Sequence, residues 1–146
     1  MTAHVLYPAL NPELPATLSP AILTGLLRQK LGYRGVVITD DLEMGAIVSH
    51  LSVGEAAVKA LLAGADMALI CHSLEQAWEA RATCEQALTN GTLAQSRLAE
   101  AYHRVATLKK HHFRPGLPPP LSSIGSPEHQ KLVEEIERRA SRSMSV

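Results

Sequence analysis

A short apolar segment that ends in two carboxylates constrains the fold of this chain more than any other feature. Residues 36–39 read Val-Val-Ile-Thr and are followed at once by Asp40 and Asp41. A run of β-branched residues without polar alternation is typical of a parallel strand that is covered on both faces. In α/β barrels the reactive groups lie at the carboxyl ends of such strands. The segment therefore predicts a buried parallel strand with a candidate site where it ends.

The same order of strand and helix recurs along the first 112 residues. Predicted strands cover residues 1–7, 36–39 and 66–71. Predicted helices cover residues 20–31, 53–63, 74–90 and 93–112. Three βα units in this order predict an α/β fold with a parallel sheet and right-handed crossovers.

Capping motifs and apolar stripes in the sequence support the predicted helices. Ser52 with Glu55 forms a capping box, in which each side chain accepts a hydrogen bond from a free backbone N–H. The same spacing recurs in Ser73 with Gln76 and in Thr92 with Gln95. The helix at residues 20–31 carries an apolar stripe of Ile22, Leu23, Leu26, Leu27 and Leu31, and the helix at residues 93–112 carries a regular apolar face of Leu98, Tyr102, Val105 and Leu108. Both patterns are typical of helices that pack on a core.

Composition narrows the function classes. Aromatic residues make up 3% of the 146 residues, so the core must be built from Leu, Ala, Val and Ile. The 14 basic and 14 acidic residues cancel, which does not favour nucleic acid or an anionic membrane as partner and fits a neutral sugar or small molecule. The two cysteines, Cys71 and Cys84, form no metal-ligand pattern and are interpreted as reduced core thiols of a cytoplasmic protein. Neither a signal peptide nor an apolar stretch near the roughly 20 residues of a membrane span is expected.

Composition changes after residue 112 and predicts three regions. Residues 1–112 form the α/β domain, residues 113–127 form a linker rich in Pro and Ser, and residues 128–146 form a charged helix and tail. Five prolines between Arg114 and Pro127 favour an extended linker. In the tail only Leu132, Val133 and Ile136 offer an apolar face.

Residues 31–44 read Leu-Gly-Tyr-Arg-Gly-Val-Val-Ile-Thr-Asp-Asp-Leu-Glu-Met. This segment resembles the nucleophile segment of family 3 glycoside hydrolases, in the bacterial β-N-acetylhexosaminidase branch, whose strand ends in Ser/Thr-Asp-Asp/Ala-Leu-x-Met. Residues 2–5, 15–19 and 63–67 also resemble that family, so the similarity covers about residues 1–110. The β-glucosidases of the family usually carry Ser-Asp-Trp, and the segment therefore favours N-acetylglucosaminides. The implied fold is the C-terminal βα units of a (β/α)₈ barrel.

The resemblance implies that Asp40 is the catalytic nucleophile of a retaining glycosidase. It also suggests His4 and Met44 as substrate-binding residues, and it implies neither a metal nor a cofactor. From the residues alone, one aspartate of the pair can be a turn or cap residue, His4 can be a hydrogen-bonded scaffold histidine, and Met44 can simply pack. Neighbouring strand residues face opposite ways, so we expect Asp41 to point away from Asp40 or to be hydrogen-bonded.

The chain departs from the family in one respect. The complete enzymes carry a Lys-His-Phe-Pro-Gly-His-Gly segment and a following Asp/Ser/His stretch upstream of the nucleophile, which supply the acid/base histidine; these 146 residues contain neither. Three βα units are also less than half of a barrel. The chain thus resembles the C-terminal part of an enzyme that removes terminal β-linked N-acetylglucosamine, typically from cell-wall fragments during peptidoglycan recycling in the bacterial cytoplasm.

Two other hypotheses stay open. The chain can be a non-catalytic α/β module in which the linker and charged tail form an interaction arm. Alternatively, it can be one half of a split enzyme whose other half carries the acid/base segment. A partial barrel exposes sheet edges, which predicts self-association or pairing with the missing N-terminal part.

Overall fold

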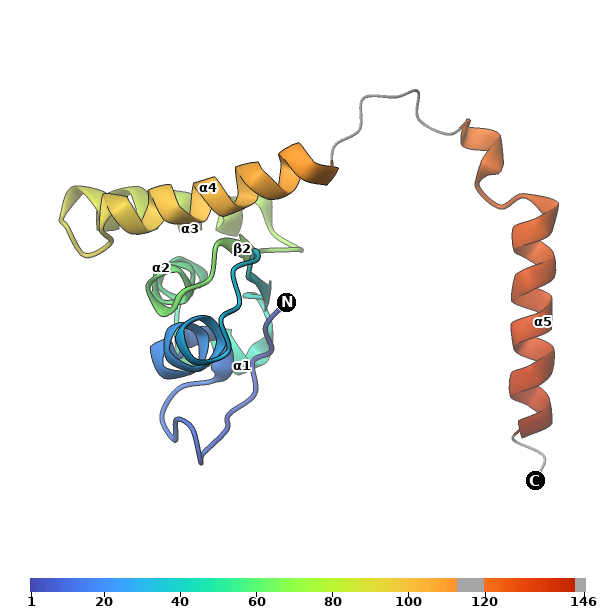
Figure 1. Ribbon diagram of the computed structural model, residues 1–146, viewed down its shortest axis with the longest axis horizontal. Coiled ribbons are helices and arrows are strands. Elements are labelled where there is room, and N and C mark those ends of the chain that lie inside the picture. Colours follow the sequence, from blue (N-terminus) through green and yellow to red (C-terminus); the bar gives the residue numbers. More distant parts are fainter. Residues whose placement is uncertain (113–119, 144–146) are drawn as a thin grey trace. The chain divides into compact units, whose positions relative to one another are not determined.

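A computed structural model describes residues 1–112 and 120–143 of the chain. The chain divides into two compact units, residues 1–113 and 114–146. The second unit contains a short 3₁₀ helix, η3 (Leu121–Ser123), and the long helix α5 (Pro127–Ser143), which lies where the charged helix was predicted (Figure 1). Most of the predicted linker, residues 113–119, and the tail residues 144–146 lie outside the described residues.

The first unit is an α/β fold made mostly of helices around a small parallel sheet (Figure 1). Strands β1 (Ile38–Asp41) and β2 (Met67–Leu69) pair in parallel, with Ile38 opposite Met67 and Asp41 opposite Leu69. Helix α2 (Val53–Ala63) connects them, preceded by the short helix α1 (Gly45–Val48). Helices α3 (Leu74–Thr89) and α4 (Gln95–His112) follow the sheet. The predicted α/β fold with parallel strands is therefore confirmed.

The predicted strand over residues 1–7 is wrong. The Thr2 amide donates to the Ile38 carbonyl at 2.8 Å, whereas the Val5 carbonyl accepts from the Ala16 amide at 2.9 Å. The chain then turns at Tyr7, whose carbonyl accepts from two amides further along. Because the backbone partners of this segment lie on different elements, it forms no ladder with β1, and the sheet has two strands in the described residues.

The two observed strands also differ from their predicted bounds. The Val37 amide donates to the Asp66 carboxylate at 2.9 Å, and the Val37 carbonyl accepts from the Asp66 and Met67 amides. Val37 therefore binds the two residues at the entry to β2 without being part of β1, which runs from Ile38 to Asp41. In β2, Met67 and Ala68 are exposed, so this apolar strand is not covered on both faces.

The segment after Ser19 forms a helix as predicted, but of a wider type. It follows a 3₁₀ turn, η1 (Ala16–Leu18), and η2 (Ala21–Lys30) is a π-helix. The Leu31 amide donates to the carbonyl of Leu26, five residues back. A wider turn moves side chains off the 3.6-residue stripe. This explains why Leu23 is buried while Leu31 is 67% exposed.

Helix α2 is the centre of the core. Its bounds, its capping box and its stop at Gly64, where φ is +122°, all match the prediction. Its small residues Ala56, Ala57, Ala60 and Ala63 are buried. Helix α3 lies so close that a Cβ at Gly54 would collide with the Thr83 hydroxyl. The buried apolar residues in the described parts are Ala, Leu, Val and Ile, as the composition requires.

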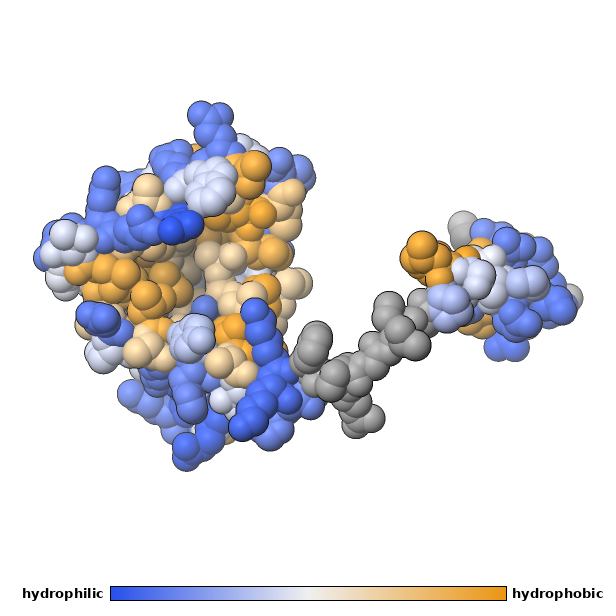
Figure 2. Space-filling view, turned by 90° about the horizontal axis from the view of Figure 1, so that it is seen from above, coloured by the Kyte–Doolittle hydropathy of each residue, from blue (hydrophilic) through white to orange (hydrophobic). Residues whose placement is uncertain are grey.

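Helix α4 does not pack through its predicted apolar face. Tyr102 is 74% exposed, and Leu98 and Leu108 are exposed as well, whereas Ala101 is buried. The helix is attached instead through Arg97 and Arg104, which reach a buried carboxylate at the start of β2. Figure 2 shows apolar side chains gathered over one face of the first unit. Among the described helices, none combines the length and hydropathy of a membrane span.

The capping box of α2 makes stability depend on pH. Hydrogen bonds from the backbone and side chain of Ser52, with a smaller contribution from Lys59, lower the pKa of Glu55 below its ordinary value. This stabilisation is complete above the ordinary glutamate pKa and is lost as the pH falls through the lowered value. We expect Glu55→Gln to flatten the stability profile in that acidic range, measured by urea unfolding at several pH values. Ser52→Ala should flatten it in the same way, and a full wild-type profile in both variants would contradict the prediction.

Candidate active site

Asp40 and Asp41 lie at the carboxyl end of β1, and their surroundings differ. Burial alternates along the strand, with Thr39 and Asp41 buried and Asp40 partly exposed. One carboxylate oxygen of Asp40 accepts from the Asp41 amide at 2.9 Å. Asp40 is therefore the more exposed residue of the pair.

Asp41 ties a turn together. Its Oδ1 accepts from the amides of Glu43 at 3.1 Å and Cys71 at 3.3 Å. Its Oδ2 lies 3.1 Å from Nδ1 of the exposed His72. The expectation that Asp41 turns away from Asp40 or is hydrogen-bonded is confirmed by this geometry.

Glu43 is a residue that the sequence patterns did not single out. Its Oε2 accepts from the amides of Cys71 at 2.9 Å and His72 at 2.6 Å, and its Oε1 accepts from Ser73 at 2.9 Å. Free N–H groups at and before the start of a helix favour an anionic acceptor. Glu43 thereby fixes the turn between β2 and α3 against the end of β1. Its partners lie about thirty residues away, so no local pattern indicates them.

Asp41, Glu43 and His72 have the spacing of a possible cation site, with ligand atoms that lie within 4.8 Å of one another. However, each carboxylate already accepts backbone N–H groups. These hydrogen bonds account for both carboxylates without an ion. In this arrangement the three side chains stabilise the turn.

His4 is held at both ring nitrogens. Nε2 lies 2.9 Å from the Asp41 carbonyl, and Nδ1 lies 2.9 Å from the hydroxyl of the buried Thr17. A carbonyl can only accept, so Nε2 donates this hydrogen bond. The Thr17 hydroxyl oxygen also lies 2.7 Å from the Thr2 hydroxyl oxygen. His4 thus braces the N-terminal segment against the end of β1.

Met44 lies just beyond β1, at the residue that precedes α1, and is 45% exposed. It therefore lies at the same end of the strand as Asp40. The roles of Asp40 as nucleophile and of His4 and Met44 as sugar contacts remain predictions at this point.

Cys71 is exposed rather than buried, contrary to the prediction, while Cys84 is partly buried, and both thiols are free. Although the residue is exposed, partial desolvation of the thiol by neighbouring atoms, followed by the nearby carboxylates of Asp41, Glu43 and Asp40, raises the pKa of Cys71. Since the thiolate is the reactive form, we expect Cys71 to react slowly with iodoacetamide near neutral pH. Glu43→Gln should speed this reaction, measured by mass spectrometry of the Cys71 peptide. The control variant Glu13→Gln, in an exposed loop, should react at the wild-type rate. Equal rates in the wild type and both variants would contradict the effect of the carboxylates on the Cys71 thiol.

The comparisons with a family model and with known proteins agree on one family. Residues 1–108 match the model of the glycosyl hydrolase family 3 N terminal domain. The β-hexosaminidase A of Pseudoalteromonas piscicida is 32% identical over 155 residues, covering 93% of this chain and 26% of the relative. The β-hexosaminidase of Nitrosomonas eutropha is 37% identical over 111 residues, covering 74% of this chain and 32% of the relative.

A solved structure agrees with these relatives. The family 3 β-N-acetylglucosaminidase from Paenibacillus sp. str. FPU-7 superposes with a TM-score of 0.80 at 40% identity, covering 93% of this chain and 27% of that one. The chain therefore spans about a quarter to a third of the length of these proteins. The matched model covers most of the chain, and the chain belongs to glycosyl hydrolase family 3.

Proposed function

We propose that this chain supplies the nucleophile strand of a retaining β-N-acetylhexosaminidase that acts on terminal β-linked N-acetylglucosamine. The observation that carries the proposal is the contrast at the end of β1, where Asp40 is partly exposed and accepts the neighbouring Asp41 amide, whereas Asp41 is buried and accepts the more distant Glu43 and Cys71 amides. A retaining glycosidase needs a carboxylate that is free to approach the anomeric carbon. The relatives described as β-hexosaminidases support the substrate class.

In the proposed reaction the Asp40 carboxylate attacks the anomeric carbon, and the bond from that carbon to the leaving-group oxygen breaks. The leaving oxygen takes a proton from a general acid, and a covalent glycosyl-enzyme remains. Water then attacks the same carbon, gives its proton to the acid/base group and releases Asp40. Met44 is placed beside the sugar in this proposal, and His4 positions the strand end through the Asp41 carbonyl.

This chain carries the proposed nucleophile without the acid/base segment, because its sequence contains no Lys-His-Phe-Pro-Gly-His-Gly motif. The proposal therefore assigns the chain to a partial (β/α)₈ barrel that further βα units complete. The exposed residues of β2 and the apolar face in Figure 2 support this, because a contiguous apolar surface favours an interface. In this proposal the completing units come from an N-terminal part of the enzyme, from a separate polypeptide with the acid/base motif, as in a split enzyme, or from a second copy of the chain.

The resemblance also leads us to propose peptidoglycan fragments in the bacterial cytoplasm as the setting of this activity. A non-catalytic interaction module is the second candidate function, and the exposed apolar face favours it as well. A stable, discrete oligomer with no activity, alone or with added βα units, would favour that second candidate.

The purified chain alone should release no phenol from a chromogenic aryl β-N-acetylglucosaminide above the buffer rate. A partial barrel leaves the sugar site incomplete, and departure of the leaving group in addition loses general acid assistance, typically a factor of about 10²–10⁴. The measurement compares the chain with Asp40→Asn, and both should give background rates. Turnover by the chain that Asp40→Asn abolishes would show that the site finds a proton donor within these 146 residues, and would overturn the need for a partner.

A further inference from the structure

A cavity of about 730 Å³ lies in the first unit beyond the amino-terminal end of β1, opposite to the end that carries Asp40. Its walls are the carboxyl-terminal end of η2, the segment that enters β1, and the second half of α4. This volume falls in the range of small-molecule sites, roughly 300–1,000 Å³. The cavity is remote from the proposed catalytic end, because Val36 lines it before β1 begins whereas Asp40 lies at the strand's far end.

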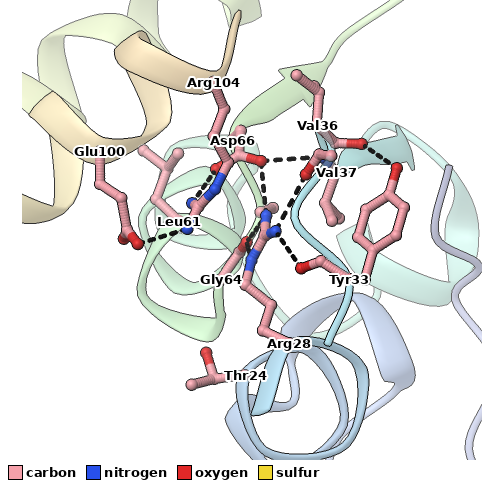
Figure 3. A network of polar contacts seen from close by, with 12 residues as sticks. Thr24, Arg28, Tyr33, Val36, Val37, Leu61, Gly64, Asp66, Glu100 and Arg104 are labelled. Atoms are coloured by element: carbon pink, nitrogen blue, oxygen red, sulfur yellow. Dashed lines mark hydrogen bonds and ion pairs between the residues drawn. The ribbon is translucent and has the colours of Figure 1, made fainter. Parts of the chain in front are cut away.

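The lining is strongly basic. The groups that line the cavity and carry or can gain positive charge are Arg28, Arg34, Arg104, His103, His111 and His112. Glu100 is the acidic group in the lining, and it is already paired with Arg104. Behind the wall, the Asp66 carboxylate binds Arg28 at 2.6 Å and Arg104 at 3.0 Å, as Figure 3 shows for this network.

Carboxylates neutralise most of the positive charge in the cavity wall, but part of that charge has no carboxylate against it. Arg28, Arg97 and Arg104 bring three charges against the two carboxylates of Asp66 and Glu100. Arg34 adds a further charge, and its exposed side chain makes no hydrogen bond or ion pair with the described part of the chain. The wall therefore holds an excess of about two positive charges before any histidine is protonated.

The three histidines can increase that excess. His103 and His111 lie eight residues apart on α4, about two helical turns, and His112 follows in the last turn. Their rings have no hydrogen-bond or ion-pair partner among residues 1–112 and 120–143. Helix carboxyl ends repel anions, and both η2 and α4 end near this cavity. Basic residues in their last turns, including Lys30, Lys109 and Lys110, oppose that effect.

We propose that this cavity binds a small polyanion, a compound with at least two phosphate, sulfonate or carboxylate charges. Arg34 and the histidines of α4 supply the free donors, while Arg28 and Arg104 supply a fixed positive background. Binding strengthens as the histidines gain protons. The other titratable groups in the lining are Tyr33 and Glu100, from the segment before β1 and from α4.

The test is a titration of the whole chain, followed through the histidine ring resonances by NMR at constant ionic strength. Benzenedisulfonate is the first probe, because its charge is the same at about pH 6 and about pH 8. Pyrophosphate and citrate are the second and third probes, and they distinguish a phosphate ligand from a carboxylate ligand. We expect saturable shifts of His103, His111 and His112, with at least about fivefold tighter binding of benzenedisulfonate at the lower pH.

The variant Arg34→Gln with His103→Gln should weaken binding at least about fivefold. The matched control, Arg81→Gln with His129→Gln, removes the same residue types from exposed positions on α3 and α5 and should leave binding unchanged. Circular dichroism checks that both variants are folded. Three results would overturn the proposal. They are histidine resonances that do not shift saturably, affinity that falls equally in both double variants, and affinity for benzenedisulfonate that is equal at the two pH values. None of these readouts depends on sugar hydrolysis, so the proposed catalytic function can fail independently.

Discussion

Replacement of Asp66 by Asn is expected to lower the free energy of unfolding by about 3–5 kcal/mol, the usual cost of removing one partner from a buried ion pair. The Asp66 side chain has no exposed surface and accepts from three guanidinium groups, those of Arg28 at 2.6 Å, Arg104 at 3.0 Å and Arg97 at 3.2 Å. It also accepts from the Val37 amide at 2.9 Å. An amide offers one acceptor oxygen and no charge, so the variant removes the counter-ion of Arg28 and leaves Arg97 and Arg104 to share the carboxylate of Glu100.

The large effect follows from what Asp66 connects. The three arginines come from η2 and α4, Val37 precedes β1, and Asp66 itself precedes β2, so one carboxylate joins four elements (Figure 3). Urea unfolding followed by circular dichroism measures the change. Glu85→Gln is the matched control, because it breaks an exposed pair with Arg81 and such pairs contribute little. A loss for Asp66→Asn no larger than that of the control would contradict the prediction.

The second large effect is expected in a complete enzyme. We expect a chimera of the Nitrosomonas eutropha β-hexosaminidase, in which residues 1–108 replace the matching segment, to hydrolyse an aryl β-N-acetylglucosaminide. In that chimera Asp40→Asn should lower kcat at least about a thousandfold, because no covalent intermediate can form at an amide. Steady-state kinetics measure the loss, and thermal unfolding checks that the variant is folded.

Glu75→Gln is the control for the chimera, because it removes an exposed carboxylate from the first turn of α3. It should leave kcat unchanged. A folded, active chimera that keeps its rate after Asp40→Asn would reject Asp40 as nucleophile. A chimera that is folded but inactive with Asp40 intact would instead indicate that this chain's segment does not form the site, and would favour the non-catalytic module.

Much of the local structure could be predicted from the sequence. The bounds of α2, its capping box and its stop at Gly64 agree with the prediction, and Ser73 accepts from the Gln76 amide at the start of α3. These features depend on residues three or four positions apart, so a local pattern contains all their partners. The carboxylate pair at the end of β1 and the family resemblance of residues 31–44 could also be recognised from one short segment of the sequence.

The tertiary structure decided the features whose partners are distant in the chain. Such features are the hydrogen bond from the Cys71 amide to Asp41, the anchoring of residues 71–73 by Glu43, and the three arginines on Asp66. They join residues about 30 to 40 positions apart. The same is true of α4, whose exposed apolar face looked like a core face and whose attachment is two arginines. A periodic pattern shows which side of a helix is apolar, but burial depends on what the rest of the fold places against that side. The sequence by itself thus determined where helices form, the caps at Ser52 and Ser73, and the strand that carries Asp40. The tertiary contacts determined which carboxylate of the pair is the more exposed.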